Sequence, residues 1–321
     1  MNGGLEILLN AAAGPQGPDP VDLAERAVDA GLSGMGLVDS PRLFLDGLVE
    51  TGRILERTSA RLAGPCVASL GLRHPTTVAG ALRTLEHHFP GRVMAVVGRG
   101  ESSVRNEGLP VPALADYLTS LESLRDLLVA DSPALAQRVL GAASGPRTLR
   151  ATGAALGGAL IDVGVDADVV ARAVALTREE RPDARVWLFL RAAVTGSDDA
   201  AAAAAEPTLG SCAMRMAAAP DWYGIAGQEL DAVRQLAASH DYARHGSAGA
   251  RHGETGSADR TVRDRFYLTG APDRIAGRLE PLAGLGITGV VLAGAVPGVH
   301  DRLADLAAAV RHGLDSPGEN P

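Results

Sequence analysis

The chain has 321 residues, of which 46% are hydrophobic and only 3% are aromatic. This length and apolar content suffice for one large α/β barrel with a mainly aliphatic core. The net charge of -8 argues against a nucleic-acid partner or an anionic membrane surface. All 30 basic residues are arginine, so any grip on phosphate must use guanidinium groups or backbone amides. Cys66 and Cys212 are too few for a disulfide framework, and no signal peptide or membrane span is evident, which together predict a cytoplasmic protein.

Predicted strands and helices alternate along the chain. Short apolar runs predict eight strands, over residues 5–9, 33–38, 63–70, 93–98, 135–142, 159–163, 186–192 and 289–293. Helices are expected between them over 21–30, 111–129 and 145–156. A further helix should follow the second strand and end at about residue 58, and a last one should begin at about residue 300. This alternation predicts a parallel sheet, and eight such units favour closure into a (β/α)8 TIM barrel over an open, doubly wound sheet.

The alternation breaks over residues 196–263, before the last strand, so we predict one domain over 1–321 with an insertion there. Asp198 and Asp199 can cap a helix of six alanines, and helical content resumes around 228–238. Residues 245–257 are too rich in Gly and Ser to pack a core. The segment from about 240 to 264 is then either a solvated loop or a mobile lid over the barrel mouth. As a lid it offers four arginines for an anionic cofactor tail, Arg244, Arg251, Arg260 and Arg263.

Polar residues lie at the ends of several predicted strands. In TIM barrels the reacting groups lie at the carboxyl ends of the strands. The residues at or just after these strands are Glu6, Asn10, Asp39, Ser40, Ser69, Gly98, Glu101 and Ser144. We expect them to face one mouth.

Two carboxylates stand out among these residues. Glu6 lies inside the first apolar strand, where a charge is costly unless it is paired or functional. Glu101 follows the fourth strand in a Gly-rich turn. As structural residues, Glu6 would pair with an arginine and Glu101 would be solvated or capping. As catalytic residues, a buried carboxyl with a raised pKa can donate a proton.

The histidines do not predict a metal site. His87 and His88 are adjacent, so on a helix they point about 100° apart and cannot chelate one ion together. His240, His245 and His252 lack metal-ligand spacing. The sequence also contains no zinc motif, phosphate-binding P-loop or Ser-His-Asp signature.

Residues 64–102 carry a family resemblance. They hold Gly-Pro-Cys-Val-Ala-Ser at 64–69, Arg-His-Pro at 73–75 and Gly-Arg-Gly-Glu-Ser at 98–102, so that two apolar strands each end in a polar or Gly-rich turn. The pattern resembles the bacterial luciferase-like superfamily, TIM barrels that bind flavin or deazaflavin. Its nearest likeness is the deazaflavin branch typified by methylenetetrahydromethanopterin reductase. The resemblance runs from Glu6 to about Val291 and weakens between Asp198 and Arg263.

The resemblance implies a cofactor site, a pair of catalytic acids and a homodimer. Glu6 and Glu101 match positions where this branch carries acids near the ring and substrate. The Cys66–Val67 bond matches a non-proline cis peptide that lies against the back of the ring. The expected cofactor-binding residues are Asp39, Ser40, Gly64, Cys66, Val67, Ser69, Gly98, Gly100, Ser144, Gly145 and Gly164.

Three functions remain open at the level of the sequence. The first is an oxidoreductase that uses coenzyme F420 to transfer hydride to or from a small organic substrate, reducing C=C or C=N bonds in secondary metabolism. The second is an FMN-dependent monooxygenase. The third is a cofactor-free barrel that acts as a binding protein. The third is kept open because Gly157-Gly158 replaces the Asp-Gly usual in the family. In addition, Asp162 falls where several relatives have a polar residue that contacts phosphate, and an acid there would repel a phosphate.

Overall fold

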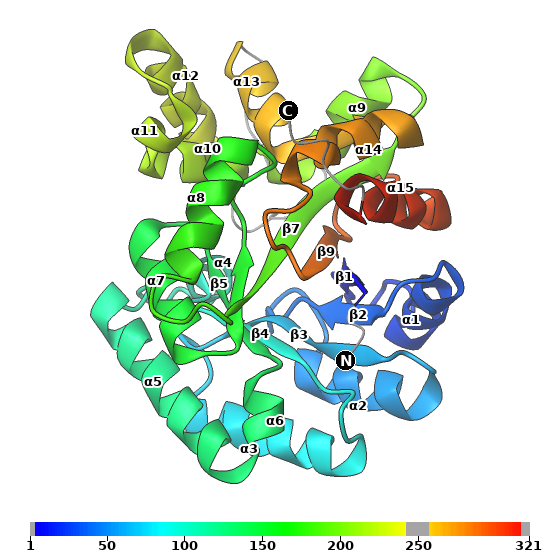
Figure 1. Cartoon of the computed structure of the whole chain (residues 1–321), viewed down its shortest axis with the longest axis vertical. Helices are drawn as coiled ribbons and strands as arrows, with labels where there is room; N and C mark the ends of the chain where they lie inside the picture. The colour runs from blue at the N-terminus through cyan, green and yellow to red at the C-terminus, as the bar shows by residue number, and fades with distance from the viewer. Residues whose placement is uncertain (1–3, 242–256, 316–321) are drawn as a thin grey trace. The chain divides into compact units, whose positions relative to one another are not determined.

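The computed structural model of the chain describes residues 4–241 and 257–315 (Figure 1). They fall into two compact units. The first consists of the described residues in 4–161, 175–188 and 288–291. The second consists of the described residues in 162–174, 189–287 and 292–315.

The first unit contains a closed barrel of parallel strands. Its strands are β1 (Glu6–Ala11), β2 (Gly34–Leu37), β3 (Leu62–Ser69), β4 (Ala95–Gly98), β5 (Val139–Ala143), β6 (Gly158–Ile161), the first part of β7 (Arg185–Val194) and the first part of β9 (Gly289–Ala293). Neighbours from β1 to β7 pair in chain order, and β9 lies between β7 and β1. Thr288 closes the ring, since its N–H donates to the carbonyl of Val186 and its own carbonyl accepts from Glu6 N–H. The predicted TIM barrel is confirmed.

Helices surround these strands in the first unit, as Figure 1 shows for α1, α2, α3 and α5. They are α1 (Pro20–Asp29), α2 (Gly47–Arg57), α3 (Pro75–His88), α4 (Glu101–Asn106), α5 (Leu114–Asp131), α6 (Pro133–Ala136) and α7 (Pro146–Ala155). Capping side chains explain where some of them begin: Asp46 Oδ1 accepts from the backbone N–H groups of Leu48 and Val49. On α2 the apolar Leu48, Ile54 and Leu55 are buried, each worth roughly 1.5–3 kcal/mol.

The second unit holds most of the insertion. Besides the end of β7 it contains α9 (Asp198–Ala205), a 3-10 turn η1 (Glu206–Thr208), α10 (Leu209–Ala218), α11 (Pro220–Tyr223), α12 (Gly227–Ala238), α13 (Ser257–Phe266), β8 (Tyr267–Gly270), α14 (Pro272–Leu279), a 3-10 turn η3 (Glu280–Leu282) and α15 (Leu303–Asp315). Strand β8 extends the sheet outside the barrel ring, parallel to the end of β7. Helix α8 (Ala167–Thr177) begins in this unit and ends in the first.

The insertion is more regular than expected. The helices around 198–205 and 228–238 are confirmed, although Ser197 rather than an aspartate caps the first of them. The expected loop character is wrong for residues 257–264, which belong to α13 and bury Ala258 and Val262. Residues 242–256, with Arg244 and Arg251, lie outside the described residues.

Two boundaries in the first unit also differ from expectation. Residues 133–136 form helix α6, so the fifth strand begins at Val139 rather than at 135. Pro133 has no N–H to donate and suits a first helical turn, which explains the short helix. Helix α7 is capped by Gly145, not by Ser144, because the Thr148 hydroxyl donates to the Gly145 carbonyl and accepts from its N–H.

Candidate functional site

Glu6 lies at the amino end of the barrel, not at its mouth. It is the first residue of β1, and its two carboxylate oxygens accept from Arg61, which directly precedes β3. Arg61 also donates to Ser33, which directly precedes β2. The expectation that Glu6 faces the mouth is therefore wrong. The strand begins at this residue, and its partners all come from strand starts.

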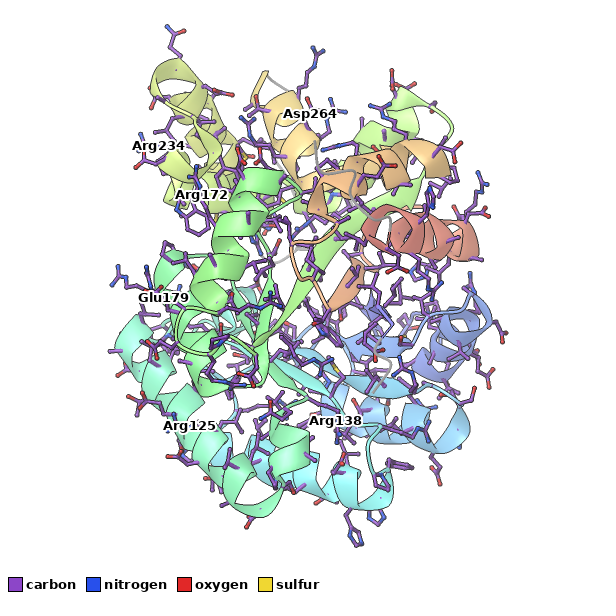
Figure 2. The ribbon with its side chains drawn as sticks, viewed as in Figure 1. Arg125, Arg138, Arg172, Glu179, Arg234 and Asp264 are labelled. Carbon is purple, nitrogen blue, oxygen red and sulfur yellow. The ribbon has the colours of Figure 1, made fainter. Side chains whose placement is uncertain are left out.

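Other charged groups share the amino end with Glu6. Arg138, labelled in Figure 2, precedes β5 and donates to Glu86 at 2.5 Å and to the carbonyl of Val93 at 2.8 Å. Arg92 donates to the carbonyls of Leu55, Thr58 and Ala60. Arg61, Arg92 and Arg138 each donate hydrogen bonds to groups of the first unit, so structural roles explain them. This end of a TIM barrel typically serves stability.

Asn10 lies near the carboxyl end of β1 and points into the barrel. It is opposite Gly36 of β2, and a Cβ atom built on Gly36 would lie 3.1 Å from Asn10 Oδ1 and 2.8 Å from Cys66 Cβ. The missing side chain at position 36 therefore leaves room for both neighbours. Asn10 is only 6% exposed, and its Oδ1 has no hydrogen-bond partner in the described part of the chain. Such a group usually meets a water, an ion or a ligand.

Asp39 and Ser40 follow β2 and are both buried, but they differ in their partners. Both oxygens of Asp39 accept from Arg73, at 2.7 Å each. This hydrogen bonding raises the pKa of the Arg73 guanidinium despite its burial. Arg73 also donates to Asp46, whose pKa stays low because that bond and two backbone N–H bonds outweigh burial. Ser40 Oγ, in contrast, has no partner among the described residues.

The carboxyl end of β3 holds the expected cis peptide. The Cys66–Val67 bond is cis, as predicted, and the register of β3 against β4 shifts between Cys66 and Ala68. Cys66 is fully buried, which raises the pKa of its thiol to about 12 and keeps it uncharged. Ser69 Oγ donates to the carbonyl of Arg99 in the turn after β4.

Several glycines at the site have structural reasons. A Cβ on Gly64 would collide with the backbone carbonyl of Met94, so this glycine lets β3 and β4 pack closely. Gly100 has φ of 75° and its Cβ would strike Ser69 Oγ. Gly98 is different, because its Cβ would meet Val67 Cγ1 at 2.7 Å beside the cis peptide. Gly145 caps α7 next to the half-buried Ser144.

Glu101 lies at the carboxyl end of the strands, as expected. It begins α4, directly after the turn that ends β4, and its side chain is 44% exposed. Its carboxylate receives hydrogen bonds from Arg105 at 3.2 Å and from Arg99 at 3.5 Å. The predicted pair of acids is thus not a pair: Glu6 and Glu101 occupy opposite ends of the barrel.

The second unit contains an ion cluster that the sequence only hinted at. Asp162 accepts from Arg191 of β7 at 2.7 and 2.9 Å and forms an ion pair with Arg215 of α10 at 2.7 Å. Arg191 is buried, and the Coulombic attraction of Asp162 outweighs burial so that the pKa of its guanidinium is raised. One carboxylate shared by two guanidinium groups leaves a net positive charge. The negative charge of Asp162 is therefore compensated by these two arginines.

Gly164 belongs to the same unit as this cluster. It has φ of 82°, and a Cβ there would collide with the carbonyl of Arg265. A turn that packs against backbone explains this glycine without a ligand.

Two buried polar residues were missing from the expected cofactor-binding and catalytic residues. Asn10 was noted at a strand end but not as a ligand-binding residue, although a single amide between Leu9 and Ala11 is a detectable signal. Arg191 likewise interrupts an apolar strand. Among the described residues, no group of His, Cys, Asp and Glu side chains could hold a metal ion. None of the described helices is both long and apolar enough to span a bilayer.

In TIM barrels the active site lies at the carboxyl ends of the strands, where this chain holds Asn10, Ser40 and Glu101. The model of the luciferase-like monooxygenase family matches residues 9–289, so the chain belongs to this family. No curated protein matches the sequence.

Solved structures with this fold include enzymes of two cofactor types. The F420-dependent tetrahydromethanopterin reductase from Methanopyrus kandleri has a TM-score of 0.72 at 16% identity, covering 99% of this chain and 100% of its own. An F420-dependent secondary alcohol dehydrogenase has a TM-score of 0.70 at 15% identity, covering 96% and 99%. The FMN-bound oxygenating constituent of 3,6-diketocamphane monooxygenase from Pseudomonas putida has a TM-score of 0.59 at 14% identity, covering 96% of each chain. At such identities the likeness concerns the fold.

Proposed function

We propose that the protein is an F420-dependent oxidoreductase that transfers hydride between the deazaflavin and a small organic substrate, reducing a C=C or C=N bond. The observation that carries the ring-cofactor part of this proposal is a pair of buried oxygens at the ends of β1 and β2, Asn10 Oδ1 and Ser40 Oγ, which have no hydrogen-bond partner within 4–241 and 257–315. They lie in a barrel of a family whose members are oxidoreductases.

The residues at this end of the first unit fit a planar heterocyclic ring. Gly36 lets the side chains of Asn10 and Cys66 lie close against β2, and Gly98 lets Val67 lie close against β4, so that all three side chains are held in place. Cys66 stays uncharged, and Asn10 and Ser40 offer hydrogen bonds to the edge of a ring. When bound, the deazaflavin supplies or accepts the hydride.

Glu101 is the acid that we propose to handle the proton. It begins α4 at the carboxyl end of the barrel and is exposed enough to exchange protons with water. Arg99 and Arg105 orient its carboxylate. Glu6 has no such role in the proposal, because its carboxylate is bound to Arg61 at the other end of the strands.

FMN is the alternative cofactor, and a specific observation favours it. Because Glu6 lies at the other end of the barrel, Glu101 is the one acid that still favours the deazaflavin branch. The polar side chains of Asn10 and Ser40 are uncharged. A neutral ring site suits reduced FMN in a monooxygenase as well as it suits F420. We also propose a cytoplasmic homodimer, in line with the family resemblance.

Fluorescence quenching with each cofactor tests the assignment. We expect the purified protein to bind F420 more tightly than FMN. Equal or tighter FMN binding would replace the reductase by the monooxygenase. If neither cofactor binds, the protein is a cofactor-free barrel, and the proposal is wrong.

A further inference from the structure

Asn10 and Ser40 lie on neighbouring segments of the barrel mouth. Strands β1 and β2 are hydrogen-bonded in parallel, with Asn10 opposite Gly36. The pairing continues past the strands, because Val38 N–H donates to the Ala11 carbonyl. The two side chains are 6% and 7% exposed, and neither Asn10 Oδ1 nor Ser40 Oγ has a partner among the described residues. A buried acceptor without a donor destabilises a fold, so these two atoms need an explanation outside the protein's own contacts.

The charged groups beside Ser40 disfavour an anion. Asp39, the carboxylate next to Ser40, accepts two hydrogen bonds from Arg73, and Asp46 shares the same guanidinium, so these three groups together carry a net negative charge. Cys66, across Gly36 from Asn10, remains a thiol because burial raises its pKa to about 12. An anionic ligand group would be repelled by this negative charge and would also meet the acceptor oxygen of the Asn10 amide. An uncharged group that combines a donor and an acceptor suits the pair best.

We propose that Asn10 and Ser40 recognise the imide edge of the bound ring, with Asn10 Oδ1 accepting from the ring N–H and the Ser40 hydroxyl donating to the adjacent ring carbonyl. This inference rests on the proposed function. It holds for F420 and FMN alike, since both rings carry an uncharged N–H between two carbonyls. Asn10 and Ser40 thereby act as positioning residues that fix the orientation of the ring in the barrel.

The test combines two variants with a modified cofactor. Dissociation constants are measured for F420, FMN and FMN methylated at the imide nitrogen, with the wild type, Asn10→Leu and Ser40→Ala. One lost hydrogen bond of about 1.4 kcal/mol corresponds to a tenfold change. We expect Asn10→Leu to raise the dissociation constants of FMN and F420 about tenfold. Methylation of FMN at the imide nitrogen should raise its dissociation constant for the wild type by a similar factor, but should have little effect on its binding to Asn10→Leu. Ser40→Ala should weaken both natural cofactors.

Thr152→Val is the matched control. Thr152 is fully buried in α7, outside the barrel wall, and its hydroxyl already donates to the Thr148 carbonyl. This variant should lower the thermal midpoint without changing cofactor affinity. Asn10→Leu should not lower the midpoint of the apo protein, because it removes a buried oxygen that has no partner in the described part of the chain.

Each result separates the inference from the function on which it rests. Cofactor binding that is insensitive to Asn10→Leu and to methylation overturns the imide contact and leaves the proposed function intact. If Asn10→Leu does not fold, the methylated FMN still decides with the wild type alone. If the wild type binds no cofactor, the proposed function and the imide contact both fail.

Discussion

Glu6 and Asn10 are only four residues apart, yet they belong to different ends of the barrel. A parallel strand rises about 3.3 Å per residue, so their Cα atoms are separated by roughly 13 Å along β1. Glu6 lies among strand starts and binds Arg61, whereas Asn10 lies beside Gly36 and Cys66 inside the barrel. The location within the strand, more than the residue type, decides what each side chain can do.

Glu101→Gln and Glu6→Gln should therefore have different effects. We expect Glu101→Gln to reduce turnover by ~10²–10⁴-fold with little change in cofactor affinity, as for loss of a proton donor. Glu6→Gln weakens an ion pair whose arginine is largely exposed, so it should cost at most about 1 kcal/mol of stability and leave turnover unchanged. Steady-state kinetics and urea unfolding of both variants give the answer. Equal loss of turnover in both would contradict the assignment of ends.

His240 makes the stability of the second unit depend on pH. Burial, and then the nearby positive charge of Arg215, lower the pKa of its imidazole, against the opposing effect of Asp241. The folded state thus favours the neutral ring, and the unfolded state binds the proton more readily. Stability is complete above the unfolded pKa of about 6.5 and falls as the pH drops below it.

Urea unfolding at pH 7.5 and 5.5 measures this dependence. The wild type should lose more stability between the two values than His240→Gln, which cannot be protonated. Identical losses would show that His240 does not contribute.

Elements pack closely where glycines permit it. Gly153 lies in α7, and a Cβ at this position would collide with the carbonyl of Thr177 at the end of α8. Gly80 lies within α3, where a Cβ would have no atom within 4 Å. The two helical glycines therefore differ in their surroundings, although the sequence gives no sign of it.

Substitution by alanine should separate these two positions. Gly80→Ala should stabilise the protein by roughly 0.5–1 kcal/mol, because alanine is the better helix former. Gly153→Ala should destabilise it by ~1–3 kcal/mol through overpacking. Thermal unfolding of the two variants provides the comparison, and a gain from Gly153→Ala would mean that α7 and α8 separate easily.

At the scale of the whole molecule, a ring cofactor that binds only the folded chain must raise its stability. At a cofactor concentration of a hundred times Kd the gain is about 2.7 kcal/mol. We expect a higher thermal midpoint with F420, a smaller rise with FMN, and a reduced rise for Asn10→Leu. Midpoints that do not respond to either cofactor would support the cofactor-free alternative.

The sequence allowed the whole barrel to be predicted, but only part of the site. All eight barrel strands were found, because each is a short apolar run bounded by turn residues. The cis peptide at Cys66–Val67 was also predicted, through the family resemblance. Within the insertion, α10 and α11 were missed, since their pattern is weaker and their apolar faces are explained only by packing within the second unit.

Local signals by themselves determined the element types, the parallel alternation and the family of this protein, because hydrophobic periodicity and turn residues act over a few neighbouring positions. Only the tertiary structure decided which polar groups are partnered. Glu6 is bound by Arg61, 55 residues away, and Asp162 by Arg191, 29 residues away. Asn10 and Ser40 have no such partner in the described residues. Hydrogen bonding and burial depend on groups brought together from distant parts of the chain. Neighbouring residues in the sequence therefore could not show that Glu6 is paired at the amino end of the barrel while Asn10 and Ser40 belong to the candidate site.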